Sequence, residues 1–173
     1  MVPGAAIAPL VAASSEEALV ALRARVETFS GARSLMRVRA TSGGRTQSFR
    51  AQLVVPSREE MELIVYTPVG TVAATIRAKG NEISSDVPAD TRLALTSWLS
   101  IAGATPAETA LLILGLPTAS EAVYEAASTG LRRAVLADAV VSFEPPQFPP
   151  VRVVITRGAD VVEIEHQEIV ATR

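Results

Sequence analysis

The chain has no cysteine among its 173 residues and only one histidine. The missing cysteines exclude disulfide bonds, thiolate metal ligands and a cysteine nucleophile, and they leave the redox compartment open. Aromatic residues are also scarce, with four Phe, two Tyr and one Trp. Since 49% of the chain is nevertheless apolar, mostly Ala, Val and Leu, the predicted core consists of small and medium-sized aliphatic side chains. Such a core suits a large sheet that is covered by helices.

An excess of positive charge is missing too. Sixteen Lys and Arg against eighteen Asp and Glu give a net charge of −2, and they are scattered along the chain, so we expect no nucleic-acid partner. No apolar run approaches the length of a membrane span. Residues 1–13 are apolar but lack the basic start of a signal peptide, and we interpret them as a flexible tether. Residues 14–173 are predicted to form one domain.

No cluster of residues indicates catalysis. The only histidine, His166, lies on the apolar face of a predicted strand, and we interpret it as structural. Glu163 and Glu165 face outward together and are expected to be solvated. One histidine with scattered carboxylates does not form a typical metal site, and no phosphate-binding glycine loop or Gly-x-Ser-x-Gly elbow is present. We therefore predict a protein that is not an enzyme, with no catalytic residue, no metal and no cofactor.

The chain is organised around three predicted strands between Phe49 and Lys79, which alternate with period two. Pro56-Ser57 is the predicted first turn, and Thr67-Pro68-Val69-Gly70 is the second. Val69 stands out because an apolar side chain at a hairpin tip has no core to enter. The positions predicted to face inward are Phe49, Ala51, Leu53, Val55, Met61, Leu63, Val65, Val72, Ala74, Ile76 and Ala78.

One helix and one strand precede these three strands. A capping box that begins at Ser14 predicts an amphipathic helix of about four turns. The next run, Arg33 to Thr41, alternates as a strand with Met36 and Val38 on its inward face. Ser42-Gly43-Gly44 then provides a hairpin loop.

Helices follow the three strands, after one more short strand from Asn81 to Val87. Asp90 caps a predicted helix that ends at Gly103. A second capping box, at Thr105, opens a strongly apolar helix that ends at Gly115. We interpret both helices as lid or plug helices, because their apolar character requires a large apolar surface to lie on.

Strands return near the C-terminus. Four segments alternate as strands, namely Leu131–Val135, Ala137–Phe143, Val151–Ile155 and Val161–Val170, and the proline-rich run Pro145–Pro150 connects two of them. The predicted fold class is therefore α+β. It is a single large curved antiparallel sheet, an unclosed half β-barrel, with an N-terminal helix and two lid or plug helices on the concave side.

The apolar positions between this sheet and the two helices have two interpretations. They form either an ordinary packed core or a hydrophobic cavity that accepts a lipid chain. Composition does not separate the two, although the shortage of bulky aromatic side chains favours the cavity. The candidate ligand-binding residues are Met36, Val38, Phe49, Leu53, Leu63, Val65, Ile76, Trp98, Leu99, Leu111 and Leu112.

Three segments, in the same order over about Ala18 to Val170, resemble the outer-membrane lipoprotein receptor family LolB. The first is the strand and loop Glu62–Thr71, in which Pro68-Val69-Gly70 corresponds to the family's Pro-Leu-Gly. The second is Ile113–Pro117, similar to the family's Ile-Leu-Gly-Leu-Pro. The third is Phe148–Val151 with the hairpin that follows it. Two features depart from the family: valine replaces leucine in the loop, and the lipidated N-terminal cysteine is missing, as expected where Met1 stands in its place.

The resemblance implies the unclosed barrel that LolB shares with the periplasmic carrier LolA, a cavity for lipoprotein acyl chains, and a membrane-targeting loop made of Pro68, Val69 and Gly70. It also implies a periplasmic protein anchored to the outer membrane by an N-terminal lipid, with a LolA-like carrier and the inner leaflet of that membrane as partners. We expect a monomer. Two alternatives stay open: a carrier or sensor of another lipid, and a structural envelope protein filled by its own side chains.

Overall fold

The computed structural model describes residues 4–86 and 99–172. In this part of the chain the helices are α1 (Ser15–Glu27) and α3 (Pro106–Ile113). The strands are β1 (Ala5–Ala6), β2 (Ala32–Ser42), β3 (Arg45–Ser57), β4 (Glu60–Tyr66), β5 (Val72–Lys79), β6 (Glu82–Ser85), β7 (Val123–Ala127), β8 (Gly130–Val135), β9 (Val140–Phe143), β10 (Arg152–Arg157) and β11 (Asp160–Ala171).

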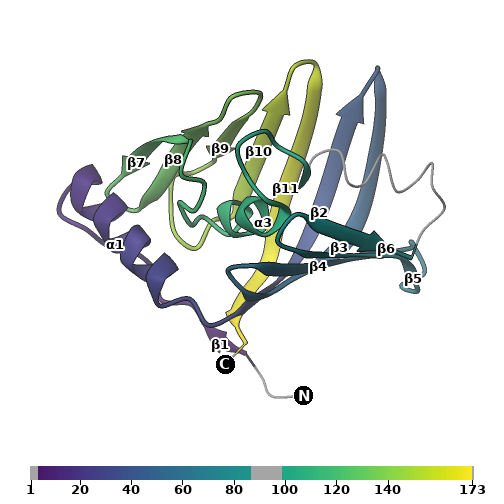
Figure 1. Ribbon diagram of the computed structural model, residues 1–173, viewed down its shortest axis with the longest axis horizontal. Helices are drawn as coiled ribbons and strands as arrows, with labels where there is room; N and C mark the ends of the chain where they lie inside the picture. The colour runs from purple at the N-terminus through teal and green to yellow at the C-terminus, as the bar shows by residue number, and fades with distance from the viewer. Residues whose placement is uncertain (1–3, 87–98, 173) are drawn as a thin grey trace.

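These strands form one open, curved, antiparallel sheet of eleven strands (Figure 1). Its order is β6-β5-β4-β3-β2-β11-β10-β9-β8-β7, and β1 pairs with β11. Helix α3 packs on β3, β4 and β5 in the concavity, whereas α1 packs on β7 and β8 (Figure 1). The predicted fold class is therefore confirmed. Most of the predicted helix from Asp90 to Gly103 lies outside the described residues, and its described end, from Leu99, is not α-helical.

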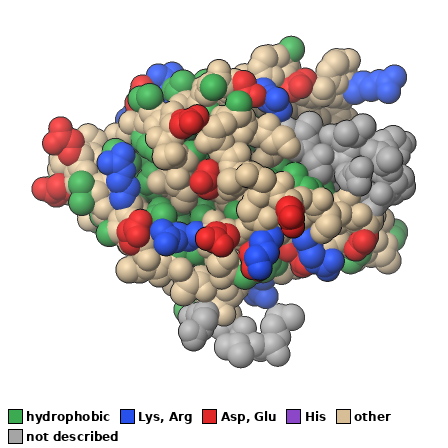
Figure 2. All heavy atoms as spheres, in the orientation of Figure 1, with side chains coloured by type: hydrophobic (Ala, Val, Ile, Leu, Met, Phe, Trp, Pro, Cys, Tyr) green, Lys and Arg blue, Asp and Glu red, His purple; other side chains and the backbone are tan. Residues whose placement is uncertain are grey.

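The sheet is apolar on its concave face because the period-two alternation holds along its central strands. Met36, Leu53, Leu63, Ile76 and Ile164 are at most 1% exposed and belong to one continuous core. The alternate residues of the same strands face outward. Acidic and basic side chains are interspersed over the surface of the protein (Figure 2). This distribution agrees with the mixed charge of the sequence.

The capping residues define both helices. The Ser14 hydroxyl accepts a hydrogen bond from the Glu17 amide at 3.2 Å, which begins α1. Thr105 and Glu108 form the full capping box of α3. At the other end, Gly115 has φ +87° and closes α3 in a Schellman motif, in which the amides of Leu116 and Gly115 donate to the carbonyls of Leu111 and Leu112.

Two local expectations about the first two hairpins are wrong. The turn expected at Pro56-Ser57 lies one residue pair later, because β3 continues through Ser57. Val72, expected inward, is 60% exposed. A β-bulge shifts the register, so that Val65 pairs with Ala74 but Tyr66 pairs with Val72, and both members of the second pair then face outward.

Strand β7 was not predicted, and it forms one edge of the sheet, where β8 is its only strand partner among the described residues. Its residues Val123–Ala127 are mostly small or exposed, so they carry a weak alternation signal.

The flexible tether expected at the N-terminus is wrong for its described residues. Ala5 and Ala6 pair with Ala171 and Val170 of β11. The amide of Leu10 donates to the carbonyl of Phe148 at 3.0 Å, and the Leu10 side chain is only 6% exposed. Hydrogen bonds and burial therefore fix this segment to the sheet.

Candidate functional site

The fold brings the predicted cavity residues together in one place. Trp98 lies outside the described residues, and Phe49 is half-buried against the core. The other nine are at most 6% exposed, namely Met36, Val38, Leu53, Leu63, Val65, Ile76, Leu99, Leu111 and Leu112. In this conformation, side chains fill the space between the concave sheet face and α3.

Helix α3 is the central piece of this interior. Seven of its eight residues are buried, all except Glu108. A helix that is apolar on every side is a core element, since a surface helix has only an apolar stripe. Helix α3 therefore occupies the concavity as a plug.

His166 fixes the C-terminal end of the plug to the sheet. Its Nε2 donates to the Ile113 carbonyl at 3.0 Å, and its Nδ1 accepts from the Ser34 hydroxyl at 2.7 Å. Both ring nitrogens are thus used by the neutral imidazole. Burial lowers the pKa of His166 to about 4, although the hydrogen bond to Ile113 acts in the opposite direction. This histidine has a structural role in connecting β11, β2 and α3.

Tyr124, on the unpredicted strand β7, makes a similar connection. Its hydroxyl donates to the carbonyl of Ala119, just after α3, at 2.8 Å. Burial raises the pKa of this phenol to about 12, so it stays protonated at neutral pH. The chain that follows the plug is therefore held by a neutral hydrogen bond to β7.

The predicted membrane-targeting loop is an ordered turn with an exposed apolar tip. The Gly70 amide donates to the Thr67 carbonyl at 2.9 Å, and the Thr67 amide donates to the Thr71 carbonyl at 2.8 Å. Gly70 has φ +88°, which suits glycine. Val69 is 85% exposed at the tip, and Val72 beside it is 60% exposed. The loop thus presents two valines to the surroundings on a hydrogen-bonded base.

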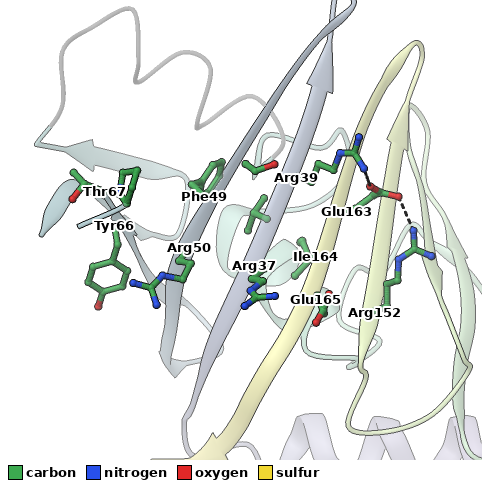
Figure 3. A pocket seen from close by; sticks show the side chains of 13 residues that line it. Arg37, Arg39, Phe49, Arg50, Tyr66, Thr67, Arg152, Glu163, Ile164 and Glu165 are labelled. Atoms are coloured by element: carbon green, nitrogen blue, oxygen red, sulfur yellow. Dashed lines mark hydrogen bonds and ion pairs between the residues drawn. The ribbon is translucent and has the colours of Figure 1, made fainter. Parts of the chain in front are cut away.

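A groove of about 550 Å³ begins at the base of this loop and runs across the outer, convex face of the sheet. We call it the outer groove (Figure 3). It shares only Val38 and Phe49 with the predicted cavity. The polar residues that line it include Arg37, Arg39, Ser48, Arg50, Tyr66, Thr67, Arg152, Glu163 and Glu165.

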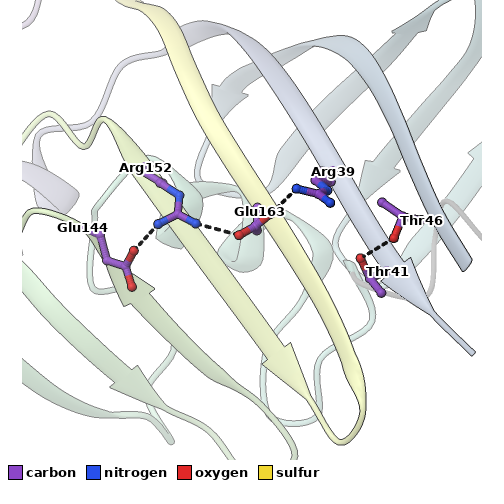
Figure 4. Close-up of polar contacts among 6 residues, drawn as sticks. All are labelled: Arg39, Thr41, Thr46, Glu144, Arg152 and Glu163. Atoms are coloured by element: carbon purple, nitrogen blue, oxygen red, sulfur yellow. Dashed lines mark hydrogen bonds and ion pairs between the residues drawn. The ribbon is translucent and has the colours of Figure 1, made fainter. Parts of the chain in front are cut away.

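One end of the outer groove is closed by a charge network (Figure 4). Glu163 lies 2.6 Å from Nη2 of Arg152 and 3.9 Å from Nη1 of Arg39, and Arg152 also pairs with Glu144. These ion pairs are partly exposed, so each contributes little to stability. They nevertheless fix the positions of the two arginines. Glu163, expected to be solvated, is instead engaged in this network.

Within the described residues, no group of three His, Cys, Asp or Glu side chains is arranged to hold a metal ion. No helix in the same residues is long and apolar enough to span a membrane.

No protein-family model matches the chain, and no curated protein sequence matches it significantly. Solved structures do match. A LolA superfamily protein from Nitrosomonas europaea has a TM-score of 0.55 at 8% identity, over 92% of this chain and 94% of that one. A DUF1329 family protein from Desulfovibrio piger has a TM-score of 0.52 at 10% identity, over 89% and 90% of the two chains. At these identities the likeness shows the fold alone, and the chain has a LolA-like fold.

Proposed function

We propose that this protein is a lipid carrier that binds acyl chains, including those of lipoproteins, between the concave sheet face and α3. The observation that supports this most directly is the interior itself. It is mainly aliphatic around Leu53, Leu63 and Ile76, and a short plug helix, not a sheet edge, closes it. An acyl chain is chemically equivalent to the side chains that it would replace.

The finer proposal is a role like that of LolB, with delivery of cargo into a membrane. Its support is the exposed Val69 on an ordered loop, together with the LolA-like fold. In this proposal the protein works in the periplasm beside the outer membrane, receives cargo from a LolA-like carrier, and is held by an N-terminal lipid. A weak apolar contact and one lipid anchor together give stable membrane attachment, whereas neither does so alone.

A titration with fluorescent fatty acyl probes of increasing length tests acyl binding. Each added CH₂ is expected to contribute about 0.8 kcal/mol, or about a fourfold tighter Kd, until the interior is full. The alternative is a structural protein whose interior is filled by its own side chains, and the burial of the nine residues supports this alternative. Such a protein would bind no probe saturably. Absence of saturable binding at every chain length would refute the carrier proposal.

A pair of valine variants tests the loop. Val69→Glu removes about 1.5–2 kcal/mol of interfacial burial and adds a charge, so vesicle binding should fall at least tenfold. Val11→Glu is the matched control, because Val11 is 87% exposed and Val69 is 85% exposed. Acyl binding and the melting temperature should stay unchanged in both variants, since both side chains are largely exposed. Equal vesicle binding by the two variants would contradict the role of the loop.

A further inference from the structure

Two arginines lie directly opposite each other in the middle of the outer groove. Arg37 of β2 pairs with Arg50 of β3 in the sheet register, and both side chains are exposed. Directly opposed residues on antiparallel strands have Cα atoms about 4.5–5.5 Å apart, so like charges in these positions repel. Within the described part of the chain, neither arginine makes a hydrogen bond or an ion pair.

This pair is an exception on its own sheet. Elsewhere on the described strands the directly opposed charged residues have opposite signs, and four of these pairs form ion pairs. Glu62 and Arg77 are 2.5 Å apart, and Glu60 and Lys79 are 3.4 Å apart. The other two pairs that form an ion pair are Glu125 with Arg133 and Glu163 with Arg39.

The neighbours of the pair compensate only part of its charge, because Glu165, which lies opposite Arg37, also lies opposite Arg152. The sheet register places Tyr66, Arg50, Arg37, Glu165 and Arg152 in one row across five strands, and Figure 3 shows them in this order. Glu165 is the only carboxylate in the row, and no ion pair joins it to Arg37 in the described residues. The other carboxylate of the groove, Glu163, is already engaged by Arg39 and Arg152. An anion placed between Arg37 and Arg50 would turn their repulsion into attraction.

The place of the pair relative to the loop indicates which anion. Arg50 is opposite Tyr66, the residue before the loop, so Arg37 is two strand spacings, or about 10 Å, from the strand that carries the loop. The polar headgroup layer of a bilayer is about 5–8 Å thick on each side. When Val69 enters the acyl boundary, Arg50, one strand spacing from the loop strand, therefore lies within reach of the headgroup layer, and Arg37 lies at its outer edge.

We propose that Arg37 and Arg50 form a binding site for the phosphate of an acidic phospholipid headgroup, which orients the protein on the membrane surface. This inference rests on the membrane-contact part of the proposed function. It adds a second contact, from the outer face of the sheet, to the apolar contact of the loop. Guanidinium groups suit this ligand because their planar donors match phosphate oxygens.

The test is co-sedimentation of the full chain with vesicles of phosphatidylcholine alone and with vesicles that contain phosphatidylglycerol. The variants are Arg37→Gln, Arg50→Gln and the double variant. The control is Arg132→Gln, which makes the same change in net charge at an exposed position of β8. Each variant is also assayed for acyl-probe binding and for its melting temperature.

We expect each single substitution to weaken binding to the acidic vesicles about fivefold, and the double substitution to weaken it about thirtyfold. Binding to neutral vesicles and to the acyl probe should not change, and the melting temperature should stay the same or rise, because a repulsive pair is removed. Inorganic phosphate at millimolar concentration should not displace the acidic vesicles if the arginine pair binds the headgroup as part of a membrane surface.

Three results would overturn the inference. They are equal loss in Arg132→Gln, an unchanged acidic-vesicle affinity in the double variant, or full competition by inorganic phosphate. The acyl-probe arm separates this failure from failure of the proposed function. A protein that binds acidic vesicles through the arginine pair but binds no acyl probe would refute the carrier role alone.

Discussion

Protonation of His166 should destabilise the protein as the pH falls from about 6.5 to about 4. In the folded state the neutral ring is buried and uses both nitrogens, one as a donor to Ile113 and one as an acceptor from Ser34. Protonation would add a second N–H where the Ser34 hydroxyl now donates, and it would place a charge in an aliphatic core. The folded state therefore takes up the proton much less readily than the unfolded chain does.

The magnitude follows from the two pKa values. Burial lowers the pKa of His166 from 6.5 to about 4. At about 1.36 kcal/mol per pH unit, this difference amounts to about 3 kcal/mol. Because the folded pKa is the lower one, this contribution is fully present above pH 6.5, declines as the pH falls and is lost below about 4. A loss of this size is a large part of the stability of an ordinary domain.

Urea unfolding at several pH values between 7 and 4 measures the effect. Protonated carboxylates contribute to the same pH range, so His166→Gln serves as the reference; glutamine retains a donor and an acceptor but does not titrate there. The difference between the two pH profiles isolates the histidine. Since His166 is the only histidine, its ring resonance in an NMR titration is unambiguous. Parallel pH profiles, or a measured pKa near 6.5, would refute the reasoning.

Three further predictions concern α3. Thr105→Ala removes its N-cap and should lower the free energy of unfolding by about 1 kcal/mol in urea titrations. Gly115→Ala should lower it by more than Gly43→Ala, because both glycines have positive φ but only at position 115 would a Cβ meet Phe148 and Pro150, at 3.2 and 3.1 Å. In hydrogen exchange, the amides of α3 should exchange faster than those of β3, β4 and β5 if the plug opens for a ligand; equal protection would argue against opening.

The features that the sequence predicts well are those that local chemistry determines. The Thr105 capping box and the Gly115 stop depend on backbone groups within a few residues, so α3 is predicted with both of its ends. The alternation of the strands between Phe49 and Lys79 is equally local, and it identifies most of the core positions.

Tertiary context explains the errors. Val72 follows the expected alternation in the sequence, but the bulge at Ala73, at the start of β5, reverses its direction, and no residue type signals a bulge there. Strand β7 lies at an edge and packs against α1, so Tyr124 and the small residues around it need no strong apolar pattern. The N-terminal segment is ordered by Leu10 and by the pairing of Ala5 with Ala171, contacts between the two ends of the chain that periodicity does not reveal.

The arginine pair could have been predicted in part, because the sequence contains a signal for its register. Gly43-Gly44 is a two-residue hairpin loop, which fixes Ser42 opposite Arg45. Counting back from that pair places Arg37 opposite Arg50. The sequence does not show which residues lie beside the arginine pair in the sheet. Glu163 and Arg152 belong to strands more than one hundred residues away in the chain.

In the proposed function, α3 and a bound acyl chain compete for the same space. Burial of Leu111, Leu112 and Ile113 stabilises the plug by about 1.5–3 kcal/mol for each side chain, and the hydrogen bond from His166 adds about 1 kcal/mol. An acyl chain of about twelve methylene groups contributes about 10 kcal/mol when it is buried in their place. The two occupants are therefore close to balanced. Such a balance suits the proposed function, because a carrier must both take up its cargo and release it. An interior that strongly preferred either occupant would prevent one of these two steps.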